Sequence, residues 1–192
     1  MDNLTITEKK LIKTHAFAQI MSSKINELGF SELVYCPLQL LDNGLLLGHL
    51  AANNPLLKLV KNDSKVQVIF RGPHGYISPR WHHEQVVPTW NYASISMHCS
   101  VSIIEDNSAK LVMMESISRF FDPDWNFDEF NNAENSKRVQ QMLSAITVFT
   151  LKIVDVNSTF KLSQNRSTDC RAAFKANLES NGNKALANIQ LI

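Results

Sequence analysis

One stretch in the middle of the chain alternates strictly between polar and apolar residues, and it constrains the fold more than any other feature. Every second position is Tyr, Ser or His: Tyr92, Ser94, Ser96, His98, Ser100 and Ser102. The positions between them are Ala93, Ile95, Met97, Cys99, Val101 and Ile103. A period of two predicts a β-strand that buries one face and exposes the other. We therefore expect a sheet whose core side receives the apolar set, while the serine-rich set is the more exposed one.

Length and composition predict one globular domain, residues 1–192. The chain has 192 residues, of which 44% are hydrophobic and 19% charged, values typical of one globular domain with a substantial core. No window approaches the roughly 20 apolar residues of a membrane span. Met1 to Lys13 carries five charged residues and lacks the apolar run of a secretory signal. We therefore expect a cytoplasmic protein without membrane attachment.

The charge balance and the cysteines exclude several classes of partner and site. Nineteen basic against eighteen acidic residues give a net charge of +1, and no helix-turn-helix or basic patch is evident. Direct DNA binding is therefore expected to be weak and non-specific. Cys36, Cys99 and Cys170 are widely separated and form no CxxC pair, so we expect reduced thiols.

Helix signals and further apolar runs complete the predicted α+β fold. Thr5 and Glu8 have capping-box spacing at the start of an N-terminal helix, placed within residues 1–14. The other predicted helical segments are 55–60, 107–121, 134–145 and 167–180, the last within a C-terminal helix and tail, 167–192. The predicted strands are 15–22, 33–41, 45–50, 65–71, 90–103 and 146–156, with 33–41 and 45–50 joined as a hairpin by Asp42-Asn43-Gly44. These segments predict one antiparallel barrel with peripheral helices.

The segment 70–81, F-R-G-P-H-G-Y-I-S-P-R-W, has the composition of a preformed binding loop. Gly72 and Gly75 would let a ligand approach the backbone, while Pro73 and Pro79 would hold the loop in one conformation. A rigid structural corner is the alternative interpretation.

Four segments together resemble one known family. They are G-H-L-A-x-x-N-P at 48–55, the segment 70–81, V-P-T-W-N-Y at 87–92 and K-L-S-Q-N at 161–165. In this order and spacing they resemble the PaiB family of FMN-binding transcriptional regulators, over residues 42–171. The resemblance implies a flavin-reductase-like split antiparallel β-barrel and a homodimer. It also implies an FMN site where barrel strands meet the subunit interface, and a role in regulation.

The three parts of FMN ask for different side chains. The phosphate favours cations and hydroxyls, for which the candidates are Arg71, Arg80, Lys161 and Ser163. The ring favours an aromatic wall, for which the candidates are Tyr76, Trp81, Trp90 and Tyr92. The pyrimidine edge favours amides, namely Asn91, Gln164 and Asn165. Ion pairing, core packing and loop capping are the respective alternatives.

We predict that ten cofactor-binding residues surround one cleft: Arg71, His74, Tyr76, Ser78, Trp81, Trp90, Asn91, Lys161, Ser163 and Gln164. No catalytic or metal-binding residue is predicted. His82 and His83 are adjacent, and no His, Cys, Asp or Glu set has the spacing of a zinc motif. Cys99 falls on the apolar face of its strand, where thiols are usually inert.

Three functions remain open from the sequence. The first is a non-enzymatic, FMN-binding regulator or sensor, and the second is an FMN-dependent oxidoreductase of pyridoxamine-phosphate-oxidase type. The third is a cofactor-free interaction dimer. It is motivated by Tyr35 and Ser96, where the family usually has histidine, and by Cys99, where it usually has glycine.

Overall fold

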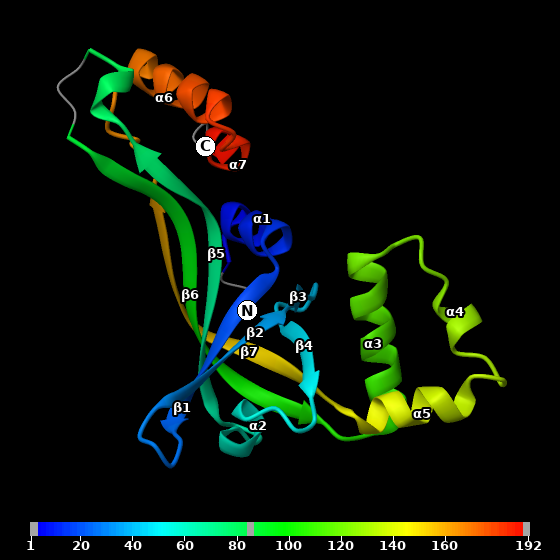
Figure 1. The fold of residues 1–192 in the computed structure, drawn as a ribbon. Helices are drawn as coiled ribbons and strands as arrows, with labels where there is room; N and C mark the ends of the chain where they lie inside the picture. Colours follow the sequence, from blue (N-terminus) through cyan, green and yellow to red (C-terminus); the bar gives the residue numbers. More distant parts are fainter. Residues whose placement is uncertain (1–3, 84–86, 190–192) are drawn as a thin grey trace. The chain divides into compact units, whose positions relative to one another are not determined.

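The computed structural model describes residues 4–83 and 87–189, in which helices flank a seven-stranded sheet (Figure 1). The strands are β1 (Phe17–Ile25), β2 (Ser31–Pro37), β3 (Gln39–Leu40), β4 (Leu46–Ala51), β5 (Lys65–Ile77), β6 (Thr89–Ile104) and β7 (Ile146–Lys161). The α-helices are α1 (Ile6–Thr14), α2 (Leu56–Leu59), α3 (Asn107–Phe121), α4 (Phe127–Phe130), α5 (Ser136–Ser144), α6 (Thr168–Ser180) and α7 (Lys184–Ile189), and η1 (Pro79–Trp81) is a 3-10 turn. The strand order is β2-β1-β5-β6-β7-β4-β3. The predicted α+β class is confirmed.

The chain divides into two compact units, which are described separately. Unit 1 comprises residues up to 70 together with 96–156, and unit 2 comprises residues 71–95 together with those from 157 onward. Strands β5, β6 and β7 each have residues in both units. The assignment of residues 1–192 to one domain stays a prediction. Residues 1–3 and 190–192, which belong to the predicted terminal segments, lie outside the described residues.

Unit 1 is built on antiparallel pairing around a buried apolar face. β1 pairs with β2 and β5, and β4 pairs with β3 and β7. In the part of β6 that belongs to unit 1, Met97, Cys99 and Val101 are buried and Ile103 is half-buried, while the serine-rich set is more exposed, as the alternation predicts. The capping box at Thr5 and Glu8 is also formed, and it starts α1 at Ile6.

The predicted hairpin in unit 1 is shorter than expected. The apolar run 33–41 divides into β2 and β3, and only β3 pairs with β4. β2 pairs instead with β1, with Tyr35 opposite Gln19. The division occurs at Leu38, which is fully buried and whose backbone N–H donates to the carbonyl of Ala16. The run therefore changes its pairing partner from β1 to β4 at Leu38. The alternation of polar and apolar residues within the run does not predict this change.

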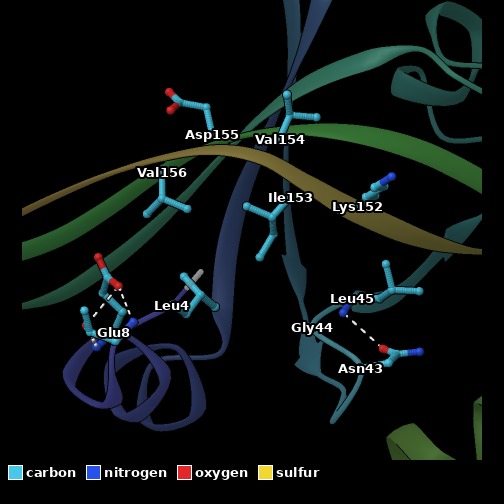
Figure 2. A pocket seen from close by; sticks show the side chains of 11 residues that line it. Leu4, Glu8, Asn43, Gly44, Leu45, Lys152, Ile153, Val154, Asp155 and Val156 are labelled. Carbon is cyan, nitrogen blue, oxygen red and sulfur yellow. Dashed lines mark hydrogen bonds between the residues drawn. The ribbon is translucent and has the colours of Figure 1, made fainter. Parts of the chain in front are cut away.

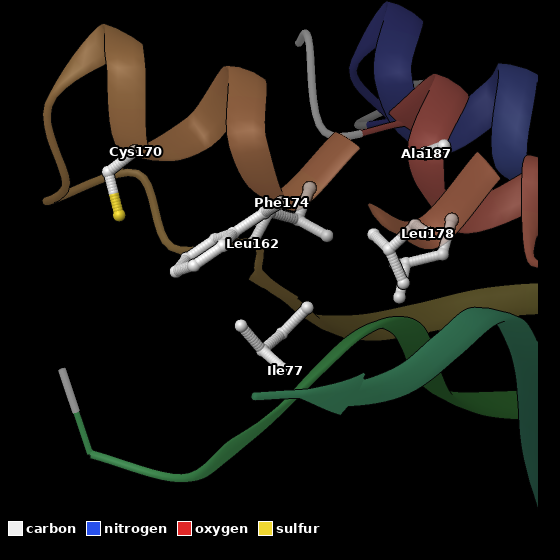
Figure 3. Close-up of a cluster of buried hydrophobic side chains, with 7 residues drawn as sticks. Ile77, Leu162, Cys170, Phe174, Leu178 and Ala187 are labelled. Carbon is white, nitrogen blue, oxygen red and sulfur yellow. The ribbon is translucent and has the colours of Figure 1, made fainter. Parts of the chain in front are cut away.

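Unit 2 has its own core beneath α6 and α7 (Figure 3). The buried members of this core are Ile77, Leu162, Cys170, Phe174, Leu178, Leu186 and Ala187. Ser167 caps α6 by accepting a hydrogen bond from the Cys170 N–H, and Gly182, with φ of +80°, follows the end of the helix as predicted. α7 was not predicted from the sequence.

The segment 70–81 is not a loop for most of its length. β5 continues to Ile77, and η1 follows directly. Gly75 does not serve ligand approach: a Cβ there would lie 2.6 Å from Asn183 Nδ2 and 3.0 Å from Leu186 Cδ2. Asn183 Nδ2 donates to the His74 carbonyl at 3.0 Å. Gly75 therefore lets the turn between α6 and α7 pack on the strand.

Candidate functional site

A pocket in unit 2 gathers polar side chains from strands that are distant in sequence. Its volume is about 160 Å³, and it lies among the ends of β5 and β7, the start of β6 and the segment that leads into α6. The lining residues are Ile77, Val87, Thr89, Asn91, Lys161, Ser163, Gln164, Asn165, Arg166 and Phe174. Four predicted site residues are among them: Asn91, Lys161, Ser163 and Gln164.

Asn91 and Ser163 form the buried polar centre of this pocket. Asn91 is 0% exposed. Its Nδ2 donates to Ser163 Oγ at 2.9 Å, and Ser163 Oγ donates to Asn91 Oδ1 at 3.1 Å. Ser163 has φ of +59°, a left-handed conformation that a non-glycine residue rarely adopts. Because such backbone costs on the order of 1–3 kcal/mol, the reciprocal pair helps to hold the loop in a conformation that it would otherwise leave.

Two cations and two hydroxyls give the pocket its electrostatic character. Lys161 Nζ donates to Thr89 Oγ1 at 2.8 Å, and Arg166 is the second cation in the lining. None of the described lining residues is an aspartate or a glutamate. A small pocket with positive charge and hydroxyl groups suits an oxyanion such as a phosphate.

Gln164 is a lining residue whose amide is used by the loop itself. Its Oε1 accepts from the Leu162 N–H at 2.9 Å, and its Nε2 donates to the Phe160 carbonyl. The amide therefore caps the end of β7, which is the alternative that the sequence left open. In this geometry it offers the pocket little hydrogen-bonding capacity.

A second group of predicted residues lies on the opposite face of the same strands. Trp90 is 50% exposed although its neighbour Asn91 is fully buried, and Tyr76 is exposed although Ile77 is buried. Successive strand residues point to opposite faces. Trp90 stacks on His74 with ring centroids 5.8 Å apart, and Tyr76 lies beside Trp90 at 6.5 Å. Arg71 Nη2 lies 2.6 Å from His74 Nε2.

The remaining predicted site residues have local structural roles. Ser78 is buried and its Oγ accepts from the Arg80 N–H, which caps η1. Trp81 packs edge-on against Phe174, with ring centroids 6.3 Å apart. The ten predicted residues thus form a pocket group, an outer-face group and a capping and packing pair, and only the four of the pocket group are among the pocket's described lining residues. Their roles in cofactor binding stay predictions.

Six of the ten described lining residues lie outside the predicted set of cofactor-binding residues. Arg166 directly follows the K-L-S-Q-N segment, and Thr89 stands inside V-P-T-W-N-Y, so both were adjacent to residues that were selected. The reversal of direction at Ser163, which brings Arg166 to the pocket, has no sequence signal because positive φ usually falls on glycine.

A larger cavity of about 420 Å³ lies in unit 1, between the start of α1, the turn before β4 and the middle of β7 (Figure 2). Glu8 is directed toward the helix start, where its carboxylate accepts from the Thr5 backbone N–H at 2.7 Å. Asn43 Oδ1 accepts from the Leu45 N–H at 3.1 Å, which closes the turn. These side chains serve local structure, and Lys152 and Asp155 give the wall both signs of charge. The cavity therefore lacks the single-sign lining of the pocket in unit 2.

Within the described ranges 4–83 and 87–189, no helix combines the length and the apolar character needed to cross a membrane.

Solved structures with the same arrangement confirm the fold class. The FAD and heme binding protein from Mycobacterium smegmatis matches with a TM-score of 0.62 at 14% identity, over 86% of this chain and 75% of that one. The flavocytochrome Anf3 from Azotobacter vinelandii matches with a TM-score of 0.54 at 12% identity, over 89% and 78%. The fold is the α+β split β-barrel with peripheral helices that was predicted.

Comparison of sequences then shows the family. Residues 5–155 match the family described as "Putative FMN-binding domain", and the chain belongs to this family. It is 33% identical over 129 residues to protease synthase and sporulation protein PAI 2 of Bacillus subtilis, over 66% of this chain and 60% of that relative. It is 33% identical over 82 residues to an uncharacterized protein of Saccharomyces cerevisiae, over 39% and 48%. The chain spans less than two thirds of the length of either relative.

Proposed function

We propose that this protein is a non-enzymatic, FMN-binding regulator or sensor, and that the pocket in unit 2 receives the FMN phosphate. The observation that carries the proposal is the pocket lining: Lys161, Arg166 and two hydroxyls, with no acidic residue among the described lining residues. Bound FMN would supply a ring that accepts and releases electrons. Lys161 and Arg166 would neutralise the phosphate, and Ser163 and Thr89 would supply hydroxyl hydrogen bonds.

The size of the pocket limits which part of FMN it can hold. Its 160 Å³ is below the roughly 300 Å³ at which pockets begin to enclose a whole small molecule. The pocket accommodates the phosphate end, so the flavin ring must find its wall elsewhere. A second copy of the chain would provide such a wall, in keeping with the homodimer that the family resemblance implies.

Unit 1 has an exposed apolar sheet face that supports this dimer. Phe17, Leu33 and Tyr35 are each more than half exposed, and Phe17 stacks on Tyr35 with ring centroids 5.5 Å apart. Strand register places Tyr35 opposite Gln19 and Leu33 opposite Met21, so these side chains occupy one face of β1 and β2. Gln19 on this face donates to the Tyr35 hydroxyl at 2.8 Å. Exposed large apolar side chains gathered on one sheet face are typical of an interaction surface.

The regulatory role rests on the relative and on the pocket chemistry. The Bacillus subtilis relative is named for protease synthesis and sporulation, which favours regulation over metabolism. The described pocket lining offers cations, hydroxyls and amides but no aspartate, glutamate or histidine to relay protons. These observations support a binding role over an oxidoreductase.

Titration with FMN tests the proposal, with flavin absorbance and fluorescence as the readouts. Lys161→Ala removes one charge-assisted hydrogen bond and should weaken FMN binding about tenfold or more. Lys184→Ala, an exposed lysine on α7 outside the pocket lining, is the matched control and should leave the affinity unchanged.

Two results would contradict the proposal. If Lys161→Ala and the parent bind FMN with equal affinity, the FMN phosphate does not bind in this pocket. Steady oxidation of NADH or NADPH by the FMN-loaded protein would favour the oxidoreductase.

A further inference from the structure

Among the residues that the structure describes, the outer face of unit 2 holds a group of hydrogen-bond donors that lack a matching acceptor. Arg71 Nη2 lies 2.6 Å from His74 Nε2, and Trp90 Nε1 lies 3.2 Å from His74 Nδ1. The guanidinium and the indole can only donate. A neutral imidazole has one acceptor nitrogen and one N–H, so it can accept from only one of its two neighbours.

No protonation state of His74 resolves this conflict within the group. If Nδ1 accepts from Trp90, Nε2 carries the proton that faces Arg71; if Nε2 accepts from Arg71, Nδ1 carries the proton that faces Trp90. Imidazolium would place two donors against two donors and add a second positive charge beside Arg71. Within residues 4–83 and 87–189, no carboxylate lies at ion-pair distance from Arg71. An oxyanion, which only accepts, would satisfy the surplus donors.

A slip in strand alternation brings these donors together. Phe70 and Gly72 are buried on β5, and so are Gly75 and Ile77, so the buried phase shifts by one residue between Gly72 and Gly75. Arg71 and His74 are three residues apart and would otherwise point to opposite faces. The shift, like that of a β-bulge, places both on the exposed face beside Trp90. The strand is thus shaped to assemble the group.

The surroundings indicate what the anion is attached to. Tyr76 and Trp90 are each about half exposed, at 47% and 50%, and their ring centroids are 6.5 Å apart. Exposed aromatic faces next to a guanidinium favour a planar ring, which they can cover by stacking.

We propose that Arg71, His74 and Trp90 form a second binding site, separate from the pocket, for an oxyanion carried on a planar ring. A phosphate held in the pocket cannot reach this group, because Trp90 and Asn91 project from opposite faces of β6. The inference does not rest on the proposed function, because its residues lie outside the lining of the pocket that is proposed for the FMN phosphate.

The probe is phenyl phosphate, and the readout is the indole N–H signal of Trp90 in a two-dimensional ¹H–¹⁵N spectrum. The chain has three tryptophans, and Trp90→Phe assigns the signal. Phenyl phosphate should shift this signal saturably and bind more tightly than inorganic phosphate, because the ring adds stacking. Arg71→Gln should weaken the binding about tenfold or more, while Arg138→Gln, an exposed arginine in α5, should not.

Lys161→Ala separates this site from the pocket, because it should weaken FMN and leave the phenyl phosphate response of Trp90 unchanged. If Arg71→Gln does not fold, His74→Ala takes its place with the same expected loss. A Trp90 signal that does not move at millimolar phenyl phosphate, or that moves equally in the parent and Arg71→Gln, would overturn the proposal.

Discussion

Burial determines the chemistry of the cysteine thiols at the scale of single residues. Cys36, Cys99 and Cys170 are at most 1% exposed. Burial raises the pKa of Cys36 and of Cys99 to about 12. Because the thiolate is the reactive form, the Cys36 and Cys99 thiols should be inert near neutral pH, in agreement with the expectation that Cys99 is inert on the apolar face of its strand.

A thiol reagent such as dithionitrobenzoate measures this directly. At pH 8 the folded protein should react slowly, and the protein in guanidinium should react quickly at all three positions. The variant Cys170→Ala should leave the slow rate unchanged. Rapid labelling of one thiol in the folded protein would show that a cysteine is reactive.

Single residues also show what alternation can and cannot predict. The period of two along β6 correctly places Ile95 and Met97 in the core. The same rule would place Arg71 and His74 on opposite faces, and it fails because Pro73 and His74 lie where the phase of β5 shifts. Local patterning predicts the faces of regular strands, whereas a bulge depends on the neighbouring strand.

At the scale of elements, β4 depends on a glycine that leaves no room for a side chain. A Cβ at Gly48 would lie 2.5 Å from Leu38 Cδ2, 3.2 Å from Phe149 Cζ and 3.3 Å from Cys36 Sγ. Leu38 is fully buried, so its side chain has little space to move. Gly48→Ala should therefore lower the free energy of unfolding by about 1–3 kcal/mol, the usual cost of overpacking.

Urea denaturation of Gly48→Ala and the parent provides this value. Gly29→Asn is the control, because nothing lies within 4 Å of a Cβ there and asparagine tolerates its φ of +83°. If Gly48→Ala is as stable as the parent, the Leu38 side chain can move away from the new methyl group at no cost in stability.

The sequence predicts most elements and misses those that depend on distant partners. The capping box at Thr5 and the helix 107–121 agree with the structure. β5 and β7 extend beyond their predicted ends into unit 2. There both strands are neighbours of β6, and the local sequence does not indicate this pairing. The pocket is predictable only in part: Asn91 and Ser163 stand in recognisable segments, but Arg166 arrives through the left-handed backbone of Ser163.

At the scale of the whole molecule, two partly buried histidines should make stability depend on pH. Burial lowers the pKa of His15 and of His49 below the ordinary value of about 6.5. The unfolded chain therefore binds protons at a higher pH than the folded chain. The two histidines contribute full stability above pH 6.5, and this contribution is lost as the pH falls through and below that value.

Thermal unfolding between pH 7.5 and pH 5 measures the effect. The unfolding midpoint should fall as the pH is lowered, and His49→Gln should fall less steeply than the parent. His83→Gln is the control, because His83 is exposed in the segment after η1. A parent whose unfolding midpoint rises toward pH 5 would contradict the sign of the shift.

The proposed homodimer is also a property of the whole molecule. Light scattering should give about twice the chain mass of 21.7 kDa. Tyr35→Lys places a charge on the apolar face of β1 and β2 and should shift the protein toward the monomer. Ser102→Lys, on the exposed face of β6, should not. A monomeric parent at micromolar concentration would argue against the dimer.

The contacts that build unit 2 join residues far apart along the chain, and this has a consequence for biosynthesis. Asn91 and Ser163 are separated by 72 positions, and Asn183 donates to His74 across 109. The two halves of unit 2 are separated along the chain by residues 96–156, which belong to unit 1. Chains with such long-range pairing fold slowly, and their early segments wait unpaired during translation. A nascent chain that ends before β7 is complete holds Asn91 without Ser163, so the pocket proposed for the FMN phosphate cannot form until residues 161–174 have been synthesised.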